Sequence, residues 1–177
     1  MSKASSAFGR DSQMHDTSFG WRFINPKLDA LYGTEGMGST AENLVELHNI
    51  SRSDQDQFAA WSQQKAQTAK EAGHLAEEIA PVHIPRRKQE DLVFSEDEFI
   101  RAGTTAEILA KLKPAFKREG GSVTAGNSSG LNDGACALLM SNQTGIERYG
   151  LTPLAQIASS AVVGVEPRIM GIGPVQA

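Results

Sequence analysis

The alternation of apolar and polar residues in the first half of the chain predicts two consecutive helices. Ser39 and Glu42 have the S-x-x-E spacing of a capping box, and apolar residues follow at helical spacing, so a helix is expected to run to about residue 49. Ser53 is expected to begin a longer helix that stops at Gly73. One side of that helix is expected to pack against the protein, and the other, rich in Gln and Lys, to face water. The packed side contains Phe58, Trp61, Lys65, Thr68, Ala69 and Ala72.

The middle of the chain predicts a small hairpin and a further short helix. Residues 79–85 alternate between apolar and polar side chains and include two prolines, which favours an edge strand over a central one. Residues 92–94 are expected to pair with it. Thr104 and Glu107 repeat the capping spacing, and the helix that they begin is expected to end by Pro114.

The last third of the chain predicts part of a mixed α/β core. Residues 135–140 form a compact apolar run suited to a buried strand, residues 144–149 are expected to be helical, and residues 154–165 form a second long apolar stretch. A sheet of this kind normally has several more strands, so the core is expected to be incomplete.

The first 38 residues predict loops. Residues 1–16 are polar and show no sustained period, which is typical of a loose arm. Residues 17–38 mix aromatic side chains with glycine and proline, which predicts an ordered loop held by buried rings. The rings belong to Phe19, Trp21, Phe23 and Tyr32.

Composition narrows the class of protein. The 177 residues include 17 basic and 21 acidic ones, for a net charge of -4, which gives no general attraction to nucleic acid or to an anionic membrane. No apolar run approaches the ~20 residues of a membrane-spanning helix, and residues 1–10 lack the apolar middle of a secretory signal. With a single cysteine and hence no internal disulfide, a cytoplasmic location is expected.

The cysteine and the histidines offer little chemistry by themselves. Cys136 lies inside the apolar run 135–140, so it is expected to be buried as a small hydrophobe rather than to act as a nucleophile. The four histidines show no metal-ligand spacing, and no metal site is expected. They are His15, His48, His74 and His83.

One long motif resembles a known family. Residues 123–135 (VTAGNSSGLNDGA) closely resemble the signature that thiolases carry where the loop domain returns to the core. Residues 20–26 (GWRFINP) are similar to the version found in 3-oxoadipyl-CoA thiolases. Further landmarks follow in family order at 38–43 (GSTAEN), 51–56 (SRSDQD), 75–79 (LAEEI), 99–103 (FIRAG), 112–116 (LKPAF), 164–168 (GVEPR) and 170–174 (MGIGP).

The resemblance implies a partial α/β, thiolase-like fold, with an α-rich loop domain inserted in an incomplete mixed-sheet core. Residues 1–122 would form the loop domain, 123–150 the last part of the N-terminal core and 151–177 the start of the C-terminal core. The implied activity is CoA-dependent cleavage of a 3-oxoacyl-CoA, such as 3-oxoadipyl-CoA. The segments that carry the family's catalytic cysteines and histidine are absent from the sequence, so no catalytic residue is assigned and this chain alone is expected to be inactive.

The resemblance also assigns a binding site for coenzyme A, the expected substrate partner. Arg101 would lie beside the adenine and 3'-phosphate, where a planar cation suits phosphate and stacking contacts. Ala125 and Ser129 match positions that line the pantetheine tunnel, and Met37 matches a residue of the tunnel wall. The family's pocket histidine and a serine are replaced by Gly36 and Ile108.

Three interpretations of the chain remain open. It can be an internal segment of a thiolase that begins at what would be an internal methionine, a self-standing CoA-binding or interaction module, or one part of a split enzyme. Intact thiolases are dimers or tetramers, so a homo-oligomer is expected for the intact enzyme.

Overall fold

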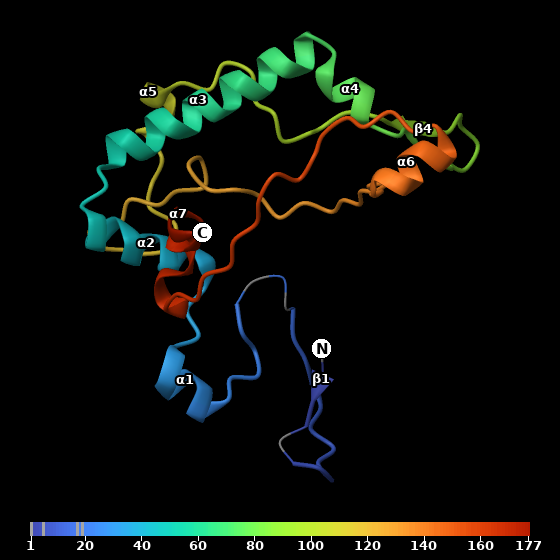
Figure 1. Cartoon of the computed structure of the whole chain (residues 1–177). Helices are drawn as coiled ribbons and strands as arrows, with labels where there is room; N and C mark the ends of the chain where they lie inside the picture. Colours follow the sequence, from blue (N-terminus) through green and yellow to red (C-terminus); the bar gives the residue numbers. More distant parts are fainter. Residues whose placement is uncertain (1, 5, 17, 19) are drawn as a thin grey trace.

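A computed structural model describes residues 2–4, 6–16, 18 and 20–177; the side chains of residues 2, 3 and 13 are outside the description. Helices dominate the described chain, joined by long extended connections (Figure 1). In chain order the elements are β1 (Ser2–Lys3), β2 (Gln13–Met14), α1 (Pro26–Tyr32), α2 (Met37–His48), α3 (Arg52–Glu71), α4 (His74–Glu78), β3 (Val82–Ile84), β4 (Leu92–Phe94), α5 (Ala106–Leu109), α6 (Gln143–Tyr149), the 3-10 helix η1 (Pro167–Ile172) and α7 (Gly173–Gln176).

Helices α2 and α3 form the central layer, and both predicted helices are confirmed. Asn49 ends α2 in the left-handed conformation, and Ser51 then caps α3 by accepting a hydrogen bond from the Asp54 N–H. The longer helix therefore begins at Arg52, one residue earlier than Ser53, and its cap lies at Ser51. Gly73 follows α3 with a φ of 83°, which explains the predicted stop.

Both predicted capping boxes are wrong in detail. Gly36 is the N-cap of α2, so Ser39 lies inside the first turn and Glu42 is free to bind elsewhere. In α5 the cap is Thr105, whose hydroxyl accepts from the Ile108 N–H, rather than Thr104. Both segments contain the spacing of a capping box, S-x-x-E at 39–42 and T-x-x-E at 104–107, but the backbone enters each helix at a different residue.

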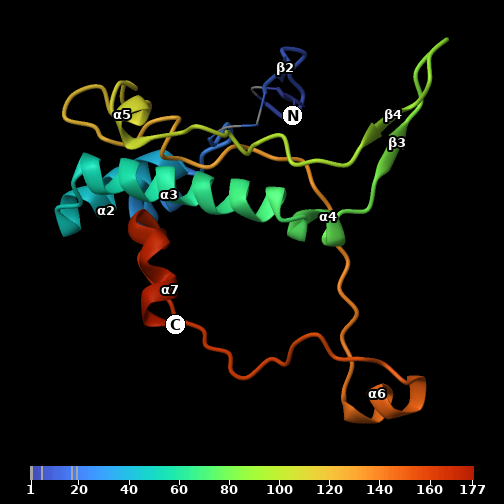
Figure 2. The ribbon, with the colours of Figure 1, turned by 90° about the horizontal axis from the view of Figure 1, so that it is seen from above.

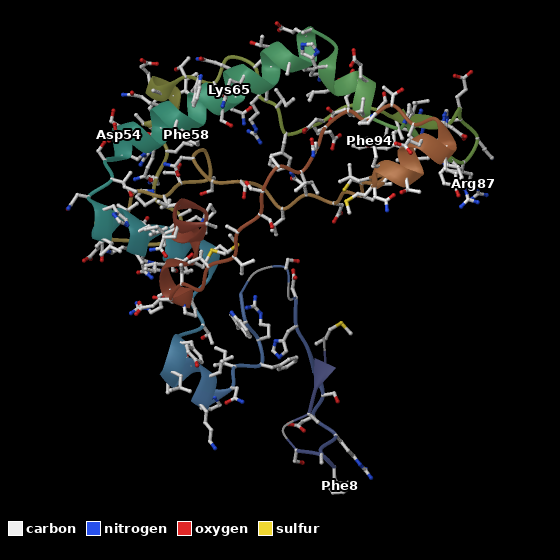
Figure 3. The ribbon with its side chains drawn as sticks, viewed as in Figure 1. Phe8, Asp54, Phe58, Lys65, Arg87 and Phe94 are labelled. Carbon is white, nitrogen blue, oxygen red and sulfur yellow. The ribbon has the colours of Figure 1, made fainter. Side chains whose placement is uncertain are left out.

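The predicted packed side of α3 is also wrong. Phe58 and Trp61 are 65% and 53% exposed, whereas the buried residues of the helix are Asp56 and Ala60. Helix α5 packs against α3, and Asp56 bonds to Asn127, so the buried side is the one these contacts cover. Figure 3 shows Phe58 and Lys65 along the same helix, and the Lys65 ammonium lies 3.7 Å from the centre of the Trp61 ring.

The hairpin at 79–94 is confirmed. Strands β3 and β4 pair antiparallel with Val82 opposite Phe94 and Ile84 opposite Leu92. Both strands are solvent-exposed on this chain. The hairpin extends away from the central helices beyond α4 (Figure 2).

The apolar runs of the last third do not form strands in this structure. Residues 135–140 and 154–165 are extended but unpaired, and Leu138 and Leu154 are 85% and 100% exposed. A strand needs a hydrogen-bonding neighbour, and neither run pairs with another segment among the described residues. Helix α6 is confirmed, but it lies between these runs and away from β3 and β4 (Figure 2).

The chain leaves an unusually large surface uncovered. Its accessible area is 14999 Å² for a mass of 19.0 kDa, whereas a compact monomer of that mass exposes about 8,400 Å². Among the described residues the buried apolar side chains are those of Ala60, Leu109 and Val123. The predicted incompleteness of the core is therefore visible in the structure, where a mixed α/β chain lacks a central sheet among its described residues.

The N-terminal region contains a short hairpin where a loose arm was predicted. Strands β1 and β2 pair antiparallel, with Ser2 opposite Met14. Of the four predicted buried rings, Phe19 lies outside the described residues, and Trp21 and Tyr32 are half exposed. Phe23 is partly buried and meets the His15 ring edge-on at 6.0 Å.

None of the helices among the described residues combines the length and the apolar character that a membrane-spanning helix needs.

Candidate functional site

The segment that begins the recognised motif is fixed to α2 by a buried carboxylate. The Oε1 atom of Glu42 accepts hydrogen bonds from the backbone N–H groups of Ser122 and Val123, at 2.9 and 2.8 Å. Glu42 is only 4% exposed. Because charge-assisted bonds to backbone N–H groups are strong, Glu42 fixes the point at which the chain enters the motif.

A second buried carboxylate fixes the motif to α3. Asp56 is 2% exposed and accepts from the Arg52 Nε at 2.7 Å and from the Asn127 Nδ2 at 3.0 Å. The Arg52 Nη2 also donates to the carbonyl oxygens of Leu109 and Leu112, at 2.7 and 3.0 Å. The Arg52–Asp56 pair therefore joins α3, the end of α5 and the motif in one network.

Residues 124–127 form a tight turn held by its own side chains. The Thr124 hydroxyl accepts from the N–H groups of Gly126 and Asn127, and the Asn127 Oδ1 accepts from the Thr124 N–H at 2.7 Å. Thr124 is completely buried. Since threonine and asparagine often stabilise turns in this way, the sequence builds the turn locally and leaves Ala125 exposed at its surface.

Two glycines allow the motif to contact the segment that carries Arg101. A Cβ at Gly126 would lie 2.5 Å from the Leu112 side chain, and one at Gly130 would collide with the ring of Phe99. Only a residue without a side chain permits these approaches. The structure therefore places residues 99–112 directly against residues 126–130.

Arg101 has an anchored backbone and an exposed side chain. Its N–H donates to the Gln63 Oε1 at 2.8 Å, and its carbonyl accepts from the Thr104 hydroxyl at 2.8 Å. The ion pairs found among the described residues do not involve its guanidinium. An exposed guanidinium on an anchored backbone is suited to receive a phosphate.

The structure brings three of the four predicted binding residues into one region. Ala125 is exposed within the turn 124–127 and Ser129 is exposed just after it, and this part of the motif packs on residues 99–112, the segment of Arg101. Met37 lies apart from them at the start of α2, where it is 73% exposed and lines an open hollow of about 440 Å³. We refer to the region of Arg101, Ala125 and Ser129 as the loop face.

A further polar network fastens η1 to the start of α2. The Arg168 guanidinium donates two bonds of 2.9 Å to the Glu35 carboxylate, one to each oxygen. The Asn43 Nδ2 donates both to Glu35, at 2.9 Å, and to the Arg168 carbonyl, at 3.0 Å. The Arg168 bonds, followed by the Asn43 bond, hold the pKa of Glu35 below its usual value, and Glu35 raises the pKa of Arg168.

This network predicts that the attachment of η1 to α2 weakens in acid. A carboxyl whose pKa is lowered in the folded state stabilises that state above the ordinary glutamate pKa, and the contribution is lost as the pH falls through the lowered value. NMR shifts of the residue 167–172 amides should move between pH 5 and pH 3, a window around and below the ordinary glutamate pKa of about 4.3. In Glu35→Gln the same amides should already resemble the acid form at pH 7. An unchanged acid transition in that variant would contradict the assignment.

Cys136 and the histidines do not form a reactive centre among the described residues. Cys136 is exposed, so its predicted burial is wrong, because the run that contains it has no neighbouring strand. His48, His74 and His83 are exposed as well. The described part of the chain has no group of three or more acidic, histidine or cysteine side chains placed to hold a metal.

The most important residues of the network escaped sequence reasoning. The sequence pattern assigns Glu42 to a capping box, and Asp56 stands out only as part of the family landmark at 51–56. The signal for both residues is a charged side chain on the buried side of an amphipathic helix, and the sequence alone does not show which side is buried.

Helices α2 and α3, the glycine- and serine-rich turn and the segment of Arg101 beside it all lie in the part of the chain that one family model matches. The family model described as "Thiolase, N-terminal domain" matches residues 1–144. The chain therefore belongs to the thiolase family, whose members are acyltransferases.

Known thiolases resemble the whole chain. The beta-ketoadipyl-CoA thiolase of Acinetobacter baylyi is 53% identical over 177 residues, all of this chain and 44% of the relative. The 3-oxoadipyl-CoA/3-oxo-5,6-dehydrosuberyl-CoA thiolase of Escherichia coli is 50% identical over the same length and the same share. The crystal structure of the Bacillus anthracis acetyl-CoA acetyltransferase superposes with a TM-score of 0.79 at 42% identity and covers 97% of this chain and 42% of that one. The chain thus spans less than half the length of these relatives.

Proposed function

We propose that this chain supplies the coenzyme A-binding part of a thiolase that cleaves a 3-oxoacyl-CoA, 3-oxoadipyl-CoA in particular, to acetyl-CoA and a shortened acyl-CoA. The names of the two curated relatives support the substrate class. The loop face is the observation that supports the proposal most strongly. In it Arg101, whose backbone is anchored, belongs to the same region as the exposed small residue Ala125 and the exposed hydroxyl of Ser129.

Each residue of the loop face has a distinct role in this proposal. Arg101 binds the 3'-phosphate and stacks on the adenine, Ala125 leaves room for the pantetheine arm, and the Ser129 hydroxyl bonds to one of its amides. Met37 forms part of the tunnel wall farther along the substrate. The loss of a serine at Ile108, which is 52% exposed, removes one polar contact but leaves these residues in place.

By resemblance to the family, the groups that perform the chemical step belong to segments absent from this sequence. Thiolysis needs a thiolate to carry the acyl group, an acid/base pair and donors for the thioester oxyanion.

We assign residues 1–122 to the loop domain, 123–150 to the end of the N-terminal core and 151–177 to the start of the C-terminal core. The intact enzyme would be a cytoplasmic homo-oligomer with acyl-CoA as its substrate.

Substitution of Arg101 tests this proposal. Arg101→Gln is expected to weaken coenzyme A binding by about tenfold, the effect of losing a charge-assisted contact. Dephospho-coenzyme A, which lacks the 3'-phosphate, should bind the original chain about as weakly as coenzyme A binds the variant. Isothermal titration calorimetry of both ligands against both proteins measures the four affinities.

The matched control is Arg87→Gln, which removes an equal charge at the far end of the β3–β4 hairpin (Figure 3) and should leave both affinities unchanged. Two results would contradict the proposal. Equal binding of coenzyme A by the original chain and Arg101→Gln would exclude the phosphate contact. Measurable thiolysis of a 3-oxoacyl-CoA by the purified chain would show that it is not limited to binding.

A further inference from the structure

The hollow beside Met37 contains a positive charge to which the proposed function has given no role. It is lined by the residues at the start of the motif at 20–26, by the two residues that precede α2 and by the first residue of α2. These are Gly20, Trp21, Arg22, Phe23, Glu35, Gly36 and Met37. Arg22 is the only cation and Glu35 the only anion among the described residues that line it.

The anion in this hollow is already engaged. Both oxygens of Glu35 accept from Arg168, and one also accepts from Asn43. The negative charge of Glu35 is therefore balanced by Arg168 of η1 rather than by Arg22. The charges of Glu35 and Arg22 sum to zero over the lining, but because Glu35 is already paired, the charge of Arg22 is left unbalanced in the hollow.

Arg22 has the capacity to bind a further acceptor. Its Nη1 donates to the carbonyl of Trp21 at 3.4 Å, which is a long bond. Asp16 feels the charge of Arg22, but that carboxylate accepts from the N–H and the hydroxyl of Ser18 at 2.9 and 2.7 Å. A guanidinium has five N–H donors, and a carboxylate is the acceptor that matches its fork geometry.

We propose that Arg22 binds the free carboxylate at the far end of a dicarboxylic acyl chain and thereby selects such thioesters over uncharged ones of equal length. The inference rests on the proposed function, because it takes the acyl chain past Met37 into the hollow. Adipyl and suberyl groups, named in the two relatives, are derived from dicarboxylic acids and carry this second carboxylate. The volume of about 440 Å³ accommodates a short acyl chain, and Trp21, Phe23 and Met37 provide apolar contacts for its methylenes.

Trp21 makes the hollow measurable by fluorescence. The chain has two tryptophans, so Trp61→Phe leaves Trp21 as the sole reporter. Adipyl- and hexanoyl-N-acetylcysteamine have the same chain length but differ in the terminal carboxylate, and neither carries the nucleotide that Arg101 is proposed to bind. In the Trp61→Phe background, adipyl thioester should change the Trp21 emission at about tenfold lower concentration than hexanoyl thioester.

Variants of Arg22 separate charge from shape. Arg22→Gln should abolish the preference for the adipyl thioester, and Arg22→Lys should keep part of it because the charge remains. Lys27→Gln removes a nearby charge that does not line the hollow and should preserve the preference. Raising the salt concentration should reduce the preference, since Arg22 is exposed.

The outcomes are distinct from those of the coenzyme A experiment. Equal response to the two thioesters, a response to neither, or a preference that survives in Arg22→Gln would each overturn the inference. A preference lost in Arg22→Gln and kept in Lys27→Gln supports it. Failure of the proposed function would appear instead as an Arg101→Gln variant that binds coenzyme A normally.

Discussion

Asp56→Ala is expected to lower the free energy of unfolding of the helical layer by about 3 kcal/mol, the usual effect of breaking a buried ion pair. The substitution leaves the Arg52 guanidinium without its carboxylate and removes one of the two acceptors of the Asn127 amide, which keeps only its bond to the Ser122 carbonyl. Arg52 is itself partly exposed, so water offsets some of the loss, and the effect should stay at the lower end of the range for buried pairs. Urea titration followed by far-UV circular dichroism measures the change.

The control for this experiment is an exposed aspartate. Asp91 lies in the connection between β3 and β4 and is exposed, so Asp91→Ala should change the unfolding free energy by no more than about 0.5 kcal/mol. Equal stability of Asp56→Ala and Asp91→Ala would mean that the network around Asp56 does not hold the motif.

Glu42→Gln is the second large effect that we expect, a loss of about 2 kcal/mol. The change preserves shape but removes the negative charge that receives the N–H groups of Ser122 and Val123, and Ser122 also donates its hydroxyl to this carboxylate. A neutral amide provides one weaker acceptor, and its NH₂ group cannot accept the bond from the Ser122 hydroxyl. The loop face should loosen together with the layer, so coenzyme A binding should weaken as well.

Glu46 provides the comparison on the same helix. It lies one turn after Glu42 and pairs with Lys117, but it is largely exposed, and surface pairs contribute little. Glu46→Gln should therefore change neither unfolding nor coenzyme A affinity measurably, with both followed by the same two assays. A larger loss in Glu46→Gln than in Glu42→Gln would reverse our interpretation of α2.

How far the sequence could predict the fold depended on where each element finds its hydrogen bonds. Helices α2, α3 and α6 satisfy their backbones locally, and the spacing of apolar and capping residues predicted them. The β3–β4 hairpin needs only a nearby partner. Residues 135–140 and 154–165 find no partner strand among the described residues, so the apolar character that predicted buried strands did not produce a sheet.

The candidate site was predictable only in part, for a related reason. Family resemblance pointed to Arg101, Ala125, Ser129 and Met37, and their binding roles stay predictions. The network beneath them depends on contacts between residues 57 to 81 positions apart, from Arg52 with Leu109 to Glu42 with Val123, which no local pattern encodes. Exposure of Phe58 and Trp61 likewise follows from which side of α3 its distant neighbours cover.

The clasp between Glu35 and Arg168 joins positions separated by 133 residues. A ribosome that adds about 5–20 residues each second needs about 7–27 s to make that stretch. Arg168 is therefore made long after Glu35 and the neighbouring helices α1 and α2. Until Arg168 has been made, Glu35 lacks its guanidinium partner and has only water and nearby donors such as the Asn43 amide. Attachment of η1 is consequently a late event in the biogenesis of this protein.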